Sequence, residues 1–293
     1  MANRRVLVKR RKAARNIRKI TRTMQLIATA RFQSAFTAAV AGRPYTDKLA
    51  ELVSNLARAT KGLDHPLLQV PEEERNSALV VITSSRGLCG GYNTNVLRST
   101  IEHLDEKAAT GLETELQIVG KKGIGYLKYL GRELAEEITT ISDQPKFEDV
   151  EPLANSLMER FITGELDSVW IAYMKFITTG KQRPVVERLL PLSPEQTLST
   201  VQESDNTEVQ YEFSPAPSEL LQELLPATVR VRFYQAFMDA TVSEHVARMV
   251  AMKAATDAAE DMIRRLTAQY NRARQTQITM ELLDIVGGAN ALA

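Results

Sequence analysis

A glycine-rich loop near residue 80 is the first stretch of the sequence whose residue types could support chemistry. The segment VVITSSRGLCGGYN, residues 80–93, has the layout of a phosphate-binding turn: an apolar run, three glycines and a helical stretch. A Walker A loop also requires a Lys and a hydroxyl residue after its last glycine, and a dinucleotide loop requires the spacing G-x-G-x-x-G. Gly87, Gly90 and Gly91 fit neither pattern. We therefore expect a tight strand-to-helix turn, with Asn93 capping the following helix.

Residues suited to other catalytic or metal-binding sites are few and widely spaced. Cys89 is the only cysteine, which excludes an internal disulfide and a cysteine-based zinc site. His65, His103 and His245 lie far apart, without the spacing of metal ligands. The G-x-S-x-G and H-E-x-x-H motifs do not occur. The sequence therefore predicts no catalytic residue, no metal site and no cofactor.

Basic and acidic residues are unevenly distributed along the chain. Residues 1–46 contain twelve Lys or Arg and no Asp or Glu, whereas the rest contains 25 basic and 36 acidic residues, a net charge of −11. Such an asymmetry indicates a partner for the basic arm. Four interpretations are open at this point: a transit peptide, a patch for nucleic acid or anionic membrane, a contact with an acidic protein, or a solvated helix face. No apolar run approaches 18 residues, so we expect neither a transmembrane helix nor a signal peptide.

Long helices are predicted at both ends of the chain. Apolar or small residues recur in steps of three and four from residue 13 onward, at Ala13, Ile17, Ile20, Met24 and Ile27. The segment after Pro226 has similar rows, Val242-Val246-Met249 and Ala259-Ile263-Leu266-Tyr270-Ala273, and has no Gly or Pro before Gly287. Pro226 is expected to kink this helix or to lie in its first turn. Helices of about sixty residues would span roughly 90 Å, which suggests an antiparallel coiled coil.

The middle of the chain has a different pattern. Apolar, β-branched or aromatic runs at 78–83, 115–120 and 169–176 alternate with helical stretches at 93–110, 123–130 and 151–163. This alternation predicts βαβ units and a mostly parallel sheet, with 183–192 as an edge strand between prolines. The fold class is therefore α/β: a small α/β domain inserted between two long helices.

Three blocks carry a resemblance to a known family: RRKAARNIRKITRTMQLIATARFQSA at 10–35, TSSRGLCGGYNTN at 83–95 and RARQTQITMELLDIVGGANAL at 272–292. They closely resemble the gamma subunits of F-type ATP synthases, and the resemblance covers essentially the whole chain. It implies a long antiparallel coiled coil of the N- and C-terminal helices with an inserted Rossmann-like α/β domain, whose glycine-rich loop binds no nucleotide. The expected boundaries are 1–60 for the N-terminal helix, 75–195 for the α/β domain, 196–217 for an exposed connection and 218–293 for the C-terminal helix.

The resemblance also implies a function. Family members form the rotating central stalk, which couples ion flow through a membrane ring to ATP synthesis or hydrolysis and is not catalytic by itself. The implied partners are three alpha and three beta subunits, the epsilon subunit and the c-ring. The implied location is peripheral, on the cytoplasmic face of the bacterial plasma membrane. We expect no transit peptide, and Cys89 alone cannot form the regulatory cysteine pair of the chloroplast branch.

The resemblance assigns contacts residue by residue. Met24 matches a packing contact with the lever of the catalytic subunit. Arg274 and Gln275 match residues that catch the beta subunit, with Thr279 and Glu281 as neighbours in that contact. At the foot of the stalk, Tyr211, Glu212 and Phe213 are assigned to the rotor ring and the epsilon subunit, although Ser214 stands where the family often has an acid.

Two functions of other classes remain as alternatives. A basic coiled coil that binds nucleic acid would show a steep dependence of affinity on salt, but the arm has few aromatic residues among its cations, so no nucleic-acid partner is expected. A nucleotide-binding enzyme would use the α/β domain, which the missing phosphate-loop Lys disfavours.

Overall fold

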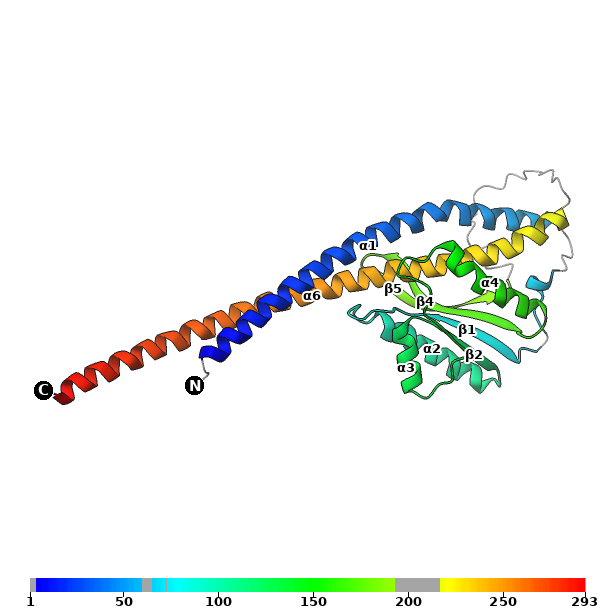
Figure 1. Cartoon of the computed structure of the whole chain (residues 1–293). Coiled ribbons are helices and arrows are strands. Elements are labelled where there is room, and N and C mark those ends of the chain that lie inside the picture. The colour runs from blue at the N-terminus through cyan, green and yellow to red at the C-terminus, as the bar shows by residue number, and fades with distance from the viewer. Residues whose placement is uncertain (1–3, 60–64, 72, 193–216, 293) are drawn as a thin grey trace. The chain divides into compact units, whose positions relative to one another are not determined.

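A computed structural model describes residues 4–59, 65–71, 73–192 and 217–292 (Figure 1). The chain divides into two compact units. We call Met1–Ala30 with Arg248–Ala293 the paired-helix unit, and Arg31–Ala247 the α/β unit. Two long helices, α1 (Arg4–Ala59) and α6 (Pro217–Leu292), contribute residues to both units.

The paired-helix unit consists of the first part of α1 and the last part of α6. The two helices are antiparallel: as the residue number increases along α1, the residue number of the contact partner on α6 decreases. Arg11 lies 4.8 Å from the ring centre of Tyr270, and Arg18 pairs with Glu260 at 3.2 Å. Further along, the hydroxyls of Thr21 and Thr256 are 2.8 Å apart and buried.

The helix seam of α1 differs from the predicted one. The buried row is Leu7, Ala14, Thr21 and Ala28, spaced by seven residues. Ile17, Ile20 and Ile27, which the sequence placed in the seam, are 51%, 59% and 51% exposed. Two of the four residues in the buried row are alanines, and the isoleucines lie on the outward side of the helix. Of the two predicted rows on α6, half the residues are buried (Val242, Val246, Ala259 and Leu266) and half are half-buried (Met249, Ile263, Tyr270 and Ala273).

Prolines lie inside both long helices. Pro44 is within α1, which continues to Ala59, and Pro226 is within α6. Because α6 begins at Pro217, Pro226 lies in its third turn rather than its first.

The α/β unit is built on a five-stranded sheet of order β3-β2-β1-β4-β5. The strands are β1 (Asn76–Ile82), β2 (Glu113–Val119), β3 (Glu136–Ile138), β4 (Ser168–Thr178) and β5 (Lys181–Leu190). β1 pairs in parallel with β2 and β4, β2 pairs in parallel with β3, and β5 is an antiparallel edge strand on β4. This order is the Rossmann order for five strands. The mostly parallel sheet and the edge strand were predicted from the sequence; the short strand β3 was not.

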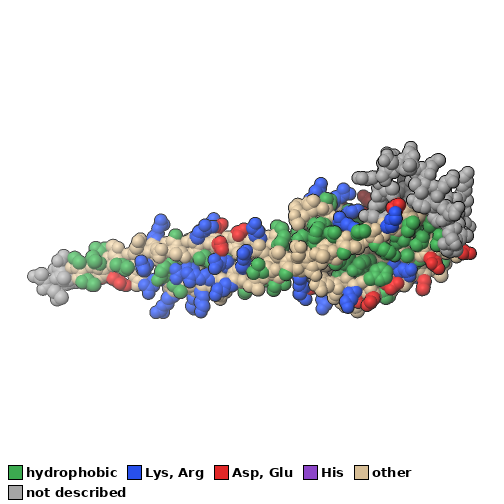
Figure 2. Space-filling view, turned by 90° about the horizontal axis from the view of Figure 1, so that it is seen from above, with side chains coloured by type: hydrophobic (Ala, Val, Ile, Leu, Met, Phe, Trp, Pro, Cys, Tyr) green, Lys and Arg blue, Asp and Glu red, His purple; other side chains and the backbone are tan. Residues whose placement is uncertain are grey.

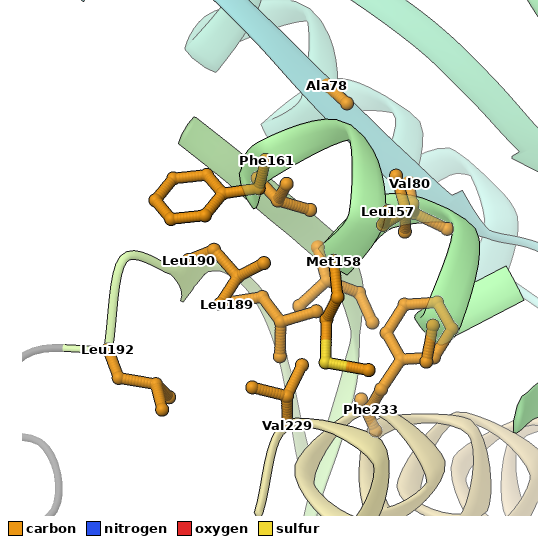
Figure 3. Close-up of a cluster of buried hydrophobic side chains, with 14 of the residues drawn as sticks. Ala78, Val80, Leu157, Met158, Phe161, Leu189, Leu190, Leu192, Val229 and Phe233 are labelled. Atoms are coloured by element: carbon orange, nitrogen blue, oxygen red, sulfur yellow. The ribbon is translucent and has the colours of Figure 1, made fainter. Parts of the chain in front are cut away.

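Helices cover both faces of the sheet (Figure 1). They are α2 (Tyr92–Ala109), α3 (Lys121–Tyr129) and α4 (Phe147–Ile162), with a short 3-10 helix η1 (Pro66–Leu68). Leu79 and Val81 of β1 pack with residues of α2 and α3 on one face. Ala78 and Val80 pack on the opposite face with Leu157 and Met158 of α4 and with Val229 and Phe233 of α6 (Figure 3). Because both faces are covered, β1 reads as a continuous apolar run, as buried parallel strands do.

Candidate interaction surface

The glycine-rich loop after β1 is closed by its own side chains. The backbone N–H of Ser84 donates to Oδ1 of Asn93 at 3.0 Å, and Nδ2 of Asn93 donates to Ser84 Oγ at 2.8 Å. The same amide lies 3.3 Å from Sγ of Cys89, which is buried. Gly91, not Asn93, occupies the N-cap of α2, so the predicted helix cap was wrong. Asn93 instead holds the loop onto the end of β1.

At the carboxyl ends of strands β1 and β2, the backbones of Thr83 and Gly120 are in close contact and leave little open space. Gly120 has φ +96°, and a Cβ at this position would lie 2.2 Å from the carbonyl oxygen of Thr83. The hydroxyl of Thr83 donates to the carbonyl of Val119 at 2.7 Å and accepts from the N–H of Gly123 at 3.0 Å. The cavity beside these residues measures about 30 Å³. That volume holds about one water molecule, whereas ligand pockets usually enclose roughly 300–1,000 Å³.

The residues that the structure describes contain neither a metal-binding cluster nor a membrane-spanning helix. Within those residues, no three His, Cys, Asp or Glu side chains are grouped in a way that could hold a metal ion. None of the described helices has an apolar stretch long enough to cross a bilayer.

The first turns of α1 form a basic surface. Ten Lys or Arg residues lie between Arg4 and Arg22, and Figure 2 shows Lys and Arg side chains gathered along this part of the helices. Among them the exposed side chains of Ile17 and Ile20 are accessible to a partner. Aliphatic groups beside guanidinium groups are typical of protein contact surfaces. We call this set the basic–aliphatic surface: α1 residues 4–27 that are not in the seam.

The predicted contact residues of α6 lie on exposed helix turns. Arg274, Gln275, Thr279 and Glu281 are all exposed. The hydroxyl of Thr279 donates to the carbonyl of Gln275 at 3.0 Å, as expected for residues four apart. Arg274 and Glu281 are seven apart and share a helix face.

The structure does not bring Met24 together with these residues. Met24 is half-buried in α1, three residues beyond Thr21, whose partner across the seam is Thr256. Arg274 is eighteen residues along α6 from Thr256, about 27 Å at 1.5 Å per residue. Met24 and Arg274 therefore occupy different levels of the paired-helix unit. Tyr211, Glu212 and Phe213 lie outside the described residues.

Large apolar side chains are exposed near the end of α6. The exposed residues of this stretch are Ile278, Met280, Leu282, Leu283, Ile285 and Val286. Exposed apolar side chains gathered in one stretch are typical of surfaces that bind another protein.

Charged side chains also gather beside buried Tyr173 where β4 and β5 pair. The hydroxyl of Tyr173 donates to Oε2 of Glu187 at 2.9 Å, and Nζ of Lys175 lies 2.8 Å from Oε1 of the same carboxylate. Burial raises the pKa of Tyr173, and the charge of Glu187 adds to this rise. Burial also lowers the pKa of Arg232 on α6. The cluster ties the edge strand to β4.

Asp239 of α6 belongs to the same region and is only 7% exposed. Burial raises the pKa of its carboxyl from 3.8 to about 6. The hydrogen bond from Nε2 of Gln235, at 3.1 Å, and the positive charges of Arg43 and Lys175 oppose this rise. The negative charge of Glu187 adds to it. The folded chain therefore retains a proton that the unfolded chain releases near pH 4.

Asp239→Asn is expected to change how stability depends on pH. As pH rises from about 4 to about 6, the contribution of Asp239 to the free energy of unfolding should fall by about 3 kcal/mol, because its folded pKa lies above its unfolded one. Asn keeps the acceptor for Gln235 but has no proton to lose. The variant should therefore exceed the wild type in stability above pH 7 by up to about 3 kcal/mol. Urea unfolding at pH 4 to 8, followed by Trp170 fluorescence, measures this difference.

Asp105→Asn is the control for this measurement, because the carboxylate of Asp105 is exposed and pairs with Arg132. It should differ from the wild type by less than about 1 kcal/mol at every pH. Parallel stability curves for Asp239→Asn and the wild type would contradict the assignment.

Three features of the structure were not predicted from the sequence. The sequence pattern placed Ile17, Ile20 and Ile27 in the seam rather than on the basic–aliphatic surface. It also did not single out Asp239 or Gly120. For Gly120 a signal was present, since the glycine directly follows the apolar run of β2, where a parallel strand ends.

Comparisons with known proteins cover the full length of the chain. The family model described as ATP synthase matches residues 3–292. The ATP synthase gamma chain of Rhodopirellula baltica is 44% identical over 294 residues, covering 100% of this chain and 99% of the relative. That of Leptospira biflexa is 40% identical over 293 residues, covering 100% of both chains.

Solved structures share the fold at lower sequence identity. A chain of the Euglena gracilis mitochondrial ATP synthase (OSCP/F1/c-ring, rotational state 3) aligns with a TM-score of 0.65 at 18% identity, covering 99% of this chain and 94% of that chain. A chain of the Tetrahymena thermophila mitochondrial ATP synthase central stalk and c-ring aligns with a TM-score of 0.56 at 21% identity, covering 80% and 99%.

Proposed function

The chain belongs to the family of ATP synthase gamma chains, and on this premise we propose that it is the non-catalytic shaft of an F-type ATP synthase. As such it couples ion flow through a membrane rotor ring to ATP synthesis or hydrolysis in a hexamer of alpha and beta subunits. It contributes no acid, base or nucleophile to the chemistry. Its contribution is differential contact with the conformational states of the catalytic subunits.

The basic–aliphatic surface is the observation that carries this proposal. Two paired helices have only a narrow seam between them, here filled by Leu7, Ala14, Thr21 and Ala28. Such a unit acts through its outer surface, which exposes Ile17 and Ile20 among a run of cations. An acidic lever with apolar residues on the catalytic subunits would complement this surface in charge and in hydrophobicity.

Individual contacts follow from the proposal. Met24 packs against the catalytic subunit, and Arg274 and Gln275 form a polar catch on the beta subunit, with Thr279 and Glu281 beside it. The exposure of the four α6 residues supports this role, because a contact residue must be accessible before assembly, and Met24 is half-buried. Tyr211, Glu212 and Phe213 are proposed to contact the rotor ring and the epsilon subunit.

The remaining partners and the location complete the proposal. Three alpha and three beta subunits surround the shaft, and the epsilon subunit and c-ring bind its foot. The subunit is peripheral and lies on the cytoplasmic face of a bacterial plasma membrane. Nucleic acid is not a partner.

Substitution of the proposed catch tests the contact directly. Arg274→Ala combined with Gln275→Ala should lower ATP hydrolysis by the reconstituted complex by about tenfold, since central interface residues contribute about 1.4 kcal/mol or more. Both side chains are exposed, so the melting temperature of the free subunit should not change. ATP hydrolysis is measured on complexes of the variant with alpha and beta subunits.

Arg265→Ala is the matched control, because Arg265 is also an exposed arginine of α6 in the same unit. It should leave hydrolysis within twofold of the wild type. Equal activities for the double variant and this control would contradict the proposed contact of Arg274 and Gln275 with the beta subunit. They would not contradict the proposed shaft role.

A further inference from the structure

A cavity of about 440 Å³ lies in the α/β unit, lined by residues of α1, α4 and α6. We propose that this cavity binds a small organic monoanion with an aromatic or alicyclic body. The proposal does not rest on assembly with other subunits, since all the lining residues belong to one unit of this chain.

Small residues create the cavity. Ala38, Ala39 and Gly42 of α1 line it, together with Ala227 of α6. A Cβ added at Gly42 would meet no atom within 4 Å. Glycine is less favourable than alanine in a helix interior, and no close packing at Gly42 requires it. Gly42 is exposed, so the missing side chain leaves this side of the cavity open for a ligand to enter from solvent.

Aromatic side chains supply the walls for a flat apolar body. Tyr45 of α1, Phe147 of α4 and Tyr234 of α6 line the cavity. The rings of Phe147 and Tyr234 are in edge-to-face contact, with centroids 5.6 Å apart. Buried Met238 also lines it. The volume falls within the range of about 300–1,000 Å³ that is usual for small-molecule pockets.

One guanidinium group determines the charge of the ligand. Nη1 of Arg230 lies 3.7 Å from Oε1 of Glu151 and 3.5 Å from Oδ1 of Asn155. Both distances exceed those of strong hydrogen bonds, and a guanidinium has five N–H donors in a fork that matches a carboxylate or sulfonate. The carboxylate of Glu151 also lines the cavity and repels a second negative charge. A single anionic group beside an aromatic body therefore fits best.

Titration of the full chain with 8-anilinonaphthalene-1-sulfonate tests the proposal. This probe is an aromatic monoanion whose fluorescence rises when it is bound. The expected result is one saturable site, with ¹³C-methyl NMR showing a titrating shift of the Met238 methyl. Arg230→Met should weaken binding of the anion about tenfold but leave binding of the neutral analogue N-phenyl-1-naphthylamine within twofold.

Gly42→Leu fills the open space and should weaken binding of both probes at least tenfold. Gly125→Leu is its matched control, because Gly125 is an exposed glycine of α3 whose added Cβ would also meet nothing. This control should bind like the wild type. If Gly42→Leu fails to fold, the Met238 shift in the wild type decides the question.

Three results would overturn the proposal. The first is an unchanged Met238 methyl while the probe binds, which would place the probe on another apolar surface. The second is the absence of saturable binding. The third is equal affinity of the wild type and a folded Gly42→Leu variant.

Discussion

Gly120→Ala is expected to destabilise the α/β unit by at least about 3 kcal/mol. Gly120 has φ +96°, a conformation that side chains other than glycine rarely adopt. A Cβ there would lie 2.2 Å from the carbonyl oxygen and 2.7 Å from the carbonyl carbon of Thr83. Because these are backbone atoms at the end of β1, relief would require the two central strands to separate. Urea unfolding of the full chain, followed by the fluorescence of Trp170, gives the change in unfolding free energy.

Gly111→Ala separates the cost of the positive φ from the cost of the steric clash with Thr83. Gly111 also has a positive φ, +79°, but an added Cβ would meet nothing within 4 Å. Its substitution should cost only the backbone strain, about 1–2 kcal/mol. A loss for Gly120→Ala no larger than that for Gly111→Ala would show that β1 and β2 do not approach each other so closely.

Phe233→Ala is expected to cost about 3–5 kcal/mol, as removal of a fully buried aromatic ring does elsewhere. Phe233 is completely buried in the core cluster that joins α6 to α4 and the sheet (Figure 3). Its ring contacts that of Phe237 edge to face, with centroids 5.2 Å apart. The substitution should lower the stability of the α/β unit and weaken the hold of α6 on it. Urea unfolding followed by Trp170 measures the first effect, and amide hydrogen exchange of residues 225–240 measures the second.

Tyr129→Ala provides the comparison for an aromatic residue outside the core. Tyr129 is 87% exposed on α3, and its loss should change stability by less than about 0.5 kcal/mol. Similar losses for Phe233→Ala and Tyr129→Ala would mean that the cluster does not hold α6 in place.

The sheet could be predicted because its signals are local. The run at 78–82 is apolar on both faces, as a buried parallel strand must be, and glycines mark the turn that follows it. β3 is short and reads EEI, so two charged residues conceal it. The close approach at Gly120 depends on Thr83, a residue 37 positions away in the sequence, and no local pattern reveals it.

The seam of the paired helices shows why periodicity alone was insufficient. The rows Leu7-Ala14-Thr21-Ala28 and Ile17-Ile20-Met24-Ile27 both have helical spacing. Hydrophobicity favoured the aliphatic row, whereas the folded helix buries the row Leu7, Ala14, Thr21 and Ala28. The isoleucines of the aliphatic row then remain exposed, as the proposed contact with other subunits requires.

The residue-level contacts could not be read from spacing. Arg274, Gln275, Thr279 and Glu281 were identified through the family resemblance, and the structure adds that all four are exposed. Nothing in their local pattern separates them from neighbouring exposed residues such as Arg272. Their roles depend on a partner surface and stay predictions until a complex is assayed.

Reconstitution with alpha and beta subunits from the same source tests the central claim most directly. The alpha–beta hexamer is assembled with and without this chain, and ATP hydrolysis and subunit stoichiometry are measured. A stable complex with one copy of the chain per hexamer, and hydrolysis above that of the hexamer alone, is the predicted result. An intact hexamer that neither retains the chain nor changes its rate of hydrolysis would contradict the shaft function.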